Sequence, residues 1–191
     1  MDDLLTTLAL AYHYPQPGST RALWKRLKDL PKSKSRAKDL LERFLKALSG
    51  LKLAEREELF TRTLELTPLT APYIGYAVYG EDYRRGRLMA ELNAAYQALG
   101  IDAAGEIPDH LIPVLRYLAV DPEPLPELRQ LLEPALHQMI QTLKTLEPSN
   151  PYLMLLEATL EAVKPYTKAP DLQLPVVMGS LFGSLSKGGH E

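Results

Sequence analysis

Apolar residues recur every three to four positions along most of the chain, which is the spacing of one face of an α-helix. In residues 34–49 the apolar positions are Ala37, Leu40, Leu41, Phe44, Leu45 and Leu48. No segment shows the sustained alternation of apolar and polar residues that is typical of a half-buried strand. Leu, Ala, Glu, Lys and Arg, which are helix formers, together make up about half of the chain. The pattern therefore predicts an all-α protein.

Prolines, glycines and capping residues divide this pattern into about eight helices. We expect them at residues 2–14, 19–30, 34–49, 53–67, 82–99, 108–119, 124–147 and 150–165. Ser19 and Asp82 are predicted N-caps, and Pro108 is suited to a first helical position. Pro134 is expected to kink its helix or to mark the true start of that helix. Because short amphipathic helices are stabilised by packing on each other, residues 1–165 are predicted to form a single compact helical domain.

The last residues of the chain differ from this domain in composition. Pro165, Pro170 and Pro175 disfavour helix, and the glycines that follow are Gly179, Gly183, Gly188 and Gly189. We therefore expect residues 166–191 to form a flexible tail, with one apolar patch from Leu174 to Leu185.

Charge is unevenly distributed, although the formal net charge is only -2. Residues 21–52 carry eleven Lys and Arg against three Asp and Glu, whereas residues 101–191 carry six against twelve. Such runs are usually solvated helix faces. The alternative is an acidic surface that receives a basic peptide.

The sequence also bears on location. The start, Met1-Asp2-Asp3, lacks the basic region of a signal peptide. No apolar run approaches the roughly 18–20 residues that cross a bilayer. We expect a cytoplasmic protein that does not insert into the membrane.

Patterns that carry enzyme chemistry are missing. The chain has no cysteine, no G-x-S-x-G element, no phosphate-binding loop and no G-x-G-x-x-G element. None of its four histidines lies in an H-E-x-x-H arrangement. Asp109 and His110 are adjacent, but helix capping explains Asp109 without catalysis. We expect no catalytic residue, no cofactor, no metal ion and no nucleic-acid partner. A helical DNA-binding protein and an uncharacterised hydrolase remain as alternatives from other classes.

Two elements in the centre of the chain carry a family pattern. Tyr79–Gly86 reads YGEDYRRG, Gly105–Leu111 reads GEIPDHL, and YQALG lies between them at Tyr96–Gly100. Together they resemble the delta-subunit assembly chaperones of respiratory nitrate reductase, within the TorD/DmsD-like redox-enzyme maturation family. The flanking segments that agree are Leu10–Pro15, Phe60–Leu66, Leu115–Ala119 and Asn150–Tyr152. The resemblance spans about residues 8–165. Leu64 and Arg116 depart from the pattern of the nitrate reductase branch.

The resemblance implies a helical chaperone without catalytic activity. Members of the family bind the N-terminal segment of a molybdenum-bearing catalytic subunit in the cytoplasm. They hold that subunit until the molybdopterin cofactor and the iron–sulfur clusters are inserted. The implied client is a nitrate reductase, with an N-oxide, sulfoxide or sulfur-compound reductase as the alternative.

A chaperone of this kind needs a groove that takes an amphipathic peptide helix. The residues that we expect to bind the peptide are Tyr76, Tyr79, Tyr83, Arg85, Met89, Glu106, Pro108, Asp109, His110 and Tyr117. For the aromatic residues, burial in the core is the competing interpretation. The oligomeric state stays open.

More specific roles are expected for some of these residues. Asp109 is expected to accept bonds from helix amides or to pair with a basic group of the client. Arg85 is expected to bridge to Glu106 or Asp109. His110 is expected to titrate near neutrality, which would make binding sensitive to pH. Gly80 and Gly86 are expected to serve turns or close packing.

Overall fold

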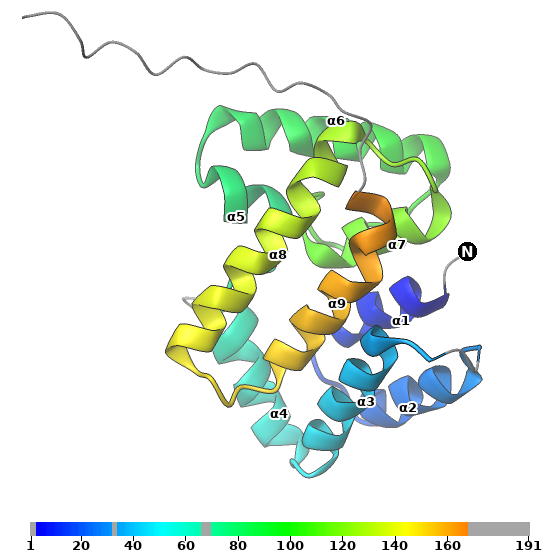
Figure 1. Cartoon of the computed structure of the whole chain (residues 1–191), viewed down its shortest axis with the longest axis vertical. Coiled ribbons are helices and arrows are strands. Elements are labelled where there is room, and N and C mark those ends of the chain that lie inside the picture. Colours follow the sequence, from blue (N-terminus) through cyan, green and yellow to red (C-terminus); the bar gives the residue numbers. More distant parts are fainter. Residues whose placement is uncertain (1–2, 32–33, 66–69, 168–191) are drawn as a thin grey trace, which may run out of the picture.

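The computed structural model describes residues 3–31, 34–65 and 70–167 (Figure 1). These residues form nine α-helices and one short π-helical segment, so the predicted all-α fold is confirmed. In chain order the elements are α1 Asp3–Ala11, α2 Ser19–Asp29, α3 Arg36–Ser49, α4 Leu53–Phe60, the π-helical segment Thr61–Glu65, α5 Ile74–Tyr79, α6 Tyr83–Leu99, α7 Leu111–Val120, α8 Pro126–Leu146 and α9 Tyr152–Thr167. Helix α5 was not predicted.

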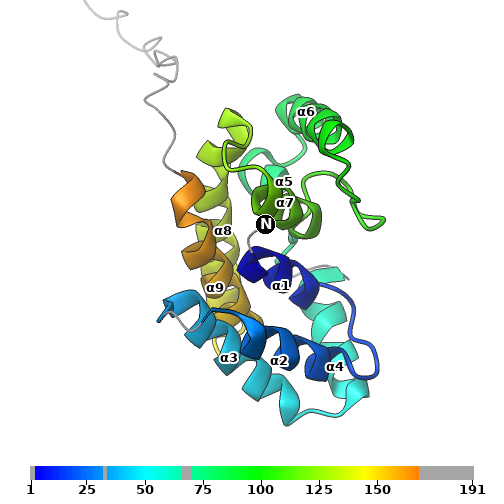
Figure 2. The same ribbon diagram turned by 90° about the vertical axis from the view of Figure 1, so that its right-hand side faces the viewer.

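Helix α9 forms the centre of the packing, because it contacts α1, α3 and α8. The first helix also packs against α7, and α5 packs against both α6 and α8. Tyr12, which follows α1, is buried, and its hydroxyl lies 2.9 Å from the Thr159 hydroxyl of α9 in a hydrogen bond. Both views place α6 at one end of the molecule, beyond α5 and α7 (Figures 1 and 2). The N-terminal and C-terminal helices therefore share one core, and α6 lies at its edge.

Helix α6 confirms two of the predicted end signals. The Asp82 side chain caps the helix by accepting a 2.9 Å bond from the Arg84 amide. Gly100 ends the helix with a left-handed φ of 65°. The helical spacing of this segment predicts an inner face of Leu88, Leu92, Ala95, Tyr96 and Leu99. Leu88, Leu92 and Tyr96 are buried and Ala95 is half-buried, whereas Leu99 is exposed, so position 99 is wrong as a core residue.

Several predicted boundaries move. The first helix ends at Ala11 rather than at residue 14, because the Tyr12 and His13 amides turn back to the carbonyls of Ala9 and Leu10. Ser19 begins α2 as a helical residue, and Gly18 takes the N-cap position that we predicted for Ser19.

The prolines also act differently from expectation. Helix α8 begins at Pro126 and runs through Pro134, so Pro134 does not mark its start. Pro108 is not the first residue of a helix, because α7 begins at Leu111 with His110 as its N-cap.

The predicted helix at 53–67 is α4 followed by the π-helical segment, and residues 66–69 lie outside the described residues. At the other end, α9 continues through Tyr166 and Thr167, two residues past the predicted start of the tail. The rest of the predicted tail, including the patch from Leu174 to Leu185, lies outside the described residues. None of the described helices combines the length and apolar character needed to cross a membrane.

Candidate peptide-binding site around the Arg85–Asp109 pair

The two sequence elements of the family pattern meet through an ion pair. Arg85, in the first turn of α6, donates from Nε to Asp109 Oδ2 at 2.8 Å and from Nη2 to Oδ1 at 3.4 Å. The Asp109 side chain is fully buried and that of Arg85 is largely buried. This hydrogen bonding raises the pKa of the Arg85 guanidinium above its ordinary value. Of the two partners predicted for Arg85, Glu106 and Asp109, the structure shows Asp109.

A short antiparallel bridge holds Asp109 in place. The Ile74 amide donates to the Asp109 carbonyl at 2.8 Å, and the Leu111 amide donates to the Pro72 carbonyl at 2.9 Å. Gly75 lies against the ion pair, since a Cβ at this position would meet Asp109 Oδ2 at 2.8 Å. Only glycine leaves room for the carboxylate there. Gly75 escaped the sequence analysis because nothing in the sequence shows that α5 and Asp109 touch.

Two tyrosine rings enclose the Arg85 guanidinium. Its Cζ atom lies 5.5 Å from the Tyr73 ring centroid and 5.2 Å from the Tyr76 ring centroid, within the range of cation–π attraction. Tyr73 also packs edge-on against the His110 ring at 5.2 Å. Burial, with Glu106 and Asp109 nearby, raises the pKa of Tyr73. Tyr76 is 42% exposed, so it forms the solvent-facing side of this cluster.

His110 is the N-cap of α7 and lies in the interior. Its Nδ1 accepts a 3.1 Å bond from the Ile112 amide. Burial, with a smaller contribution from His13, lowers the pKa of His110 to about 4. The ring is neutral at pH 7 in this environment, so the prediction that it titrates near neutrality is wrong.

A second polar cluster fastens the α5–α6 turn to α8. The Tyr79 hydroxyl donates to Glu127 Oε1 at 2.8 Å, and Arg87 Nη2 donates to the same carboxylate at 3.1 Å. Burial and Glu127 raise the pKa of Tyr79 to about 12. The Arg84 guanidinium lies 4.7 Å from the Tyr79 ring centroid. Gly80 ends α5 with φ 60° and ψ -134°, a conformation that favours glycine, so its predicted turn role is confirmed.

Tyr117 is a core residue. It is buried, its ring lies 5.5 Å from that of Tyr96, and its hydroxyl accepts a 3.1 Å bond from the Leu125 amide. Tyr96 in turn donates to the Pro108 carbonyl at 2.8 Å. The prediction that Tyr117 lines an open groove is wrong, because α7 turns this residue toward α6. Pro108 lies in the loop between α6 and α7, where its carbonyl accepts this bond from Tyr96.

The remaining predicted residues lie nearer the surface. Tyr83 is 81% exposed and Met89 is half-buried. Burial raises the pKa of the half-buried Glu106 carboxyl, and Glu65 adds to the effect. A Cβ at Gly86 would meet no atom within 4 Å, so the expected close packing at Gly86 is not found in the described part of the chain. Val78, which is also exposed on this hairpin, was missed because nothing in the sequence predicted α5.

The predicted residues thus fall into two groups. Asp109, His110 and Tyr117 are buried, which leaves Asp109 unable to meet a basic group of a client in this conformation. Tyr76 and Tyr83 face solvent on the α5–α6 hairpin, and the Tyr76 ring lies against the Arg85 guanidinium.

Among residues 3–31, 34–65 and 70–167, no three His, Asp or Glu side chains gather in a way that could hold a metal ion. No protein-family model matches the chain, and no curated protein matches it at a significant level. The family resemblance therefore rests on the sequence pattern alone.

Proposed function

We propose that the chain is a cytoplasmic assembly chaperone that binds the N-terminal segment of the molybdenum-containing catalytic subunit of a respiratory reductase. On this proposal the client is a nitrate reductase, and the chaperone assists cofactor insertion and complex assembly without enzyme activity of its own. The observation that carries the proposal is the meeting of YGEDYRRG and GEIPDHL through Arg85 and Asp109. The two segments that carry the resemblance therefore contact each other in the folded chain.

The outer face of this unit suits a peptide. The exposed apolar side chains on α5 and in the first turn of α6 include Tyr76, Val78 and Tyr83. Tyrosine combines an apolar ring with a polar hydroxyl, so it can pack against an amphipathic helix and remain stable in water when the peptide leaves. The buried members of the pattern keep the hairpin rigid, which lowers the ordering cost of binding.

Calorimetric titration tests the proposal directly. The titrant is a peptide of the first 20 or so residues of a nitrate reductase catalytic subunit, about five helical turns. Tyr83→Ser is expected to weaken binding by about tenfold or more, or roughly 1.4 kcal/mol. The matched control is Leu146→Ser. Leu146 is 55% exposed and lies in the last turn of α8, away from the end that contacts Tyr79, so this variant is expected to bind the peptide as the wild type does.

The same titration separates the two kinds of client. Tighter binding of an N-oxide, sulfoxide or sulfur-compound reductase peptide would identify that enzyme, rather than nitrate reductase, as the client. A failure of every molybdoenzyme N-terminus to bind would refute the chaperone proposal.

A further inference from the structure

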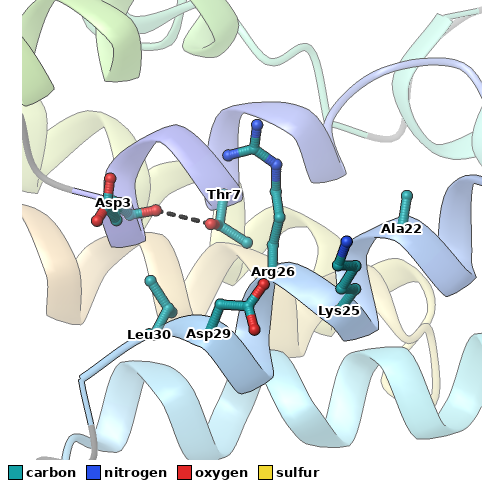
Figure 3. A pocket seen from close by; sticks show the side chains of 7 residues that line it. All are labelled: Asp3, Thr7, Ala22, Lys25, Arg26, Asp29 and Leu30. Carbon is teal, nitrogen blue, oxygen red and sulfur yellow. Dashed lines mark hydrogen bonds between the residues drawn. The ribbon is translucent and has the colours of Figure 1, made fainter.

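Three adjoining hollows follow the surface between α1 and α2. One, of about 520 Å³, is lined by the apolar side chains of Leu10, Tyr14 and Leu23. The next, of about 510 Å³, lies toward the end of α6 and is lined by Leu99, Ile101 and Val120. Leu10, Arg26 and Arg116 line both. A third hollow, of about 460 Å³, continues along α1 and α2 past Arg26 (Figure 3). We call these three hollows the α1–α2 groove.

Two arginines stand where the first two hollows meet. The guanidinium of Arg26 makes no hydrogen bond or ion pair with any residue that the structure describes. Figure 3 shows it extending from α2 away from the carboxylate of Asp29. Arg116 donates to the Asp102 backbone carbonyl at 2.9 Å, but the Asp102 carboxylate is 3.8 Å away and 86% exposed. Neither positive charge is neutralised by a buried acid.

His13 also places a polar atom without a partner at this groove. His13 lines the first hollow, and its Nε2 atom is buried without a hydrogen bond to any described residue. Buried polar atoms are normally satisfied, so an unpaired one at the wall of a hollow marks a place where a ligand atom can bind. Burial and the nearby Arg116 lower the pKa of His13 below its ordinary value.

We propose that the α1–α2 groove binds a short acidic, amphipathic segment of a partner protein. Its apolar side chains fill the hollows at Leu23 and Val120, and an Asp or Glu carboxylate lies between Arg26 and Arg116. Carboxylates form short, charge-assisted bonds with guanidinium groups, and apolar walls strengthen these bonds by reducing screening by water. A basic segment does not fit between Arg26 and Arg116, since both guanidinium groups would repel it there. This inference goes beyond the proposed function and stands whether or not that function is correct.

The test uses two synthetic helical peptides of about 16 residues, or four to five turns. Both carry the same leucine face, and the polar face carries Glu in one peptide and Lys in the other. Fluorescence anisotropy with the full chain is expected to show binding of the Glu peptide at least tenfold tighter than binding of the Lys peptide, a difference of about 1.4 kcal/mol. Equal affinities, or no binding of the Glu peptide, would overturn the proposal.

Charge reversal places the site. Arg26→Glu is expected to weaken binding of the Glu peptide by about tenfold and to strengthen binding of the Lys peptide. The matched control is Lys28→Glu, two residues further along α2, which is exposed but lines none of the three hollows. Equal losses of affinity for the Glu peptide in the two variants would mean that only the overall charge matters. That result would refute binding in the groove. Because the Arg26 side chain makes no hydrogen bond or ion pair with a described residue, thermal melts of Arg26→Glu are expected to match those of the wild type, which separates a lost site from a lost fold.

Discussion

Arg85 and Asp109 are 24 positions apart in sequence, yet they form a pair in which the carboxylate is fully buried and the guanidinium lies between two tyrosine rings. This pair joins the first turn of α6 to the residue before the cap of α7. Removing one partner leaves the other charge buried and unpaired. Replacing both partners of such a pair by apolar residues changes stability little. Removing only one partner lowers stability far more.

Arg85→Ala is therefore expected to lower the free energy of unfolding by about 3–5 kcal/mol. The double variant Arg85→Ala/Asp109→Asn is expected to be more stable than Arg85→Ala, because it no longer buries a lone carboxylate. Urea denaturation followed by circular dichroism measures these two variants and the single variant Asp109→Asn. A double variant whose loss equals the sum of the two single losses would show that the pair is not coupled.

Two glycines of the same region are expected to respond in opposite ways. Gly75→Ala puts a methyl group 2.8 Å from Asp109 Oδ2 and is expected to cost about 1–3 kcal/mol through overpacking. Gly86→Ala meets no atom within 4 Å inside α6 and is expected to stabilise the chain by roughly 0.5–1 kcal/mol. Thermal melts of the two variants compare them directly. A stable Gly75→Ala protein would mean that α5 can move away from the ion pair at little cost.

The buried His110 makes stability depend on pH. Its pKa in the folded chain is about 4, below the ordinary value of 6.5, so the unfolded chain binds a proton first as the pH falls. Stability from this group is complete above about pH 6.5 and is lost between about pH 6.5 and pH 4, by up to about 3 kcal/mol.

The variant His110→Asn keeps a capping acceptor for the Ile112 amide but does not titrate. The slope of unfolding free energy against pH is expected to flatten in this variant over pH 4–6.5. His137→Asn changes an exposed histidine on α8 and serves as the control, with the wild-type slope expected. An unchanged slope in His110→Asn would assign the pH dependence to other groups.

Asn150 is expected to be a strong stability determinant at the start of α9. Its Nδ2 donates to Thr63 Oγ1 and to Glu147 Oε2, both at 2.9 Å, and its Oδ1 accepts from the Tyr152 amide at 2.9 Å. Asn150→Ala removes all three bonds and leaves buried groups unpaired, at an expected cost of about 1–3 kcal/mol. Asn93→Ala, on the exposed face of α6, is expected to change stability by less than about 0.5 kcal/mol. Chemical denaturation of both variants in parallel would reveal a smaller role for Asn150 if their midpoints coincide.

Short-range sequence patterns were sufficient to predict the fold class and part of the candidate site. Residues 34–49 and 82–99 were predicted as helices because apolar periodicity and end signals such as Asp82 and Gly100 act over a few residues. The partner of Arg85 was narrowed to two carboxylates, Glu106 and Asp109, which both lie in the neighbouring motif element.

The sequence by itself therefore determined an all-helical chain, most helix positions, and a bridge from Arg85 to either Glu106 or Asp109, of which the tertiary structure selected Asp109. Only the tertiary structure decided which motif residues face solvent: Tyr76 and Tyr83 do, whereas His110 and Tyr117 do not. It also decided that Gly75 must lack a side chain and that Arg26 and Arg116 share one groove. The physical reason is that periodicity reports the apolar face of each helix, whereas burial depends on which helices cover that face, and those contacts join residues far apart in the chain.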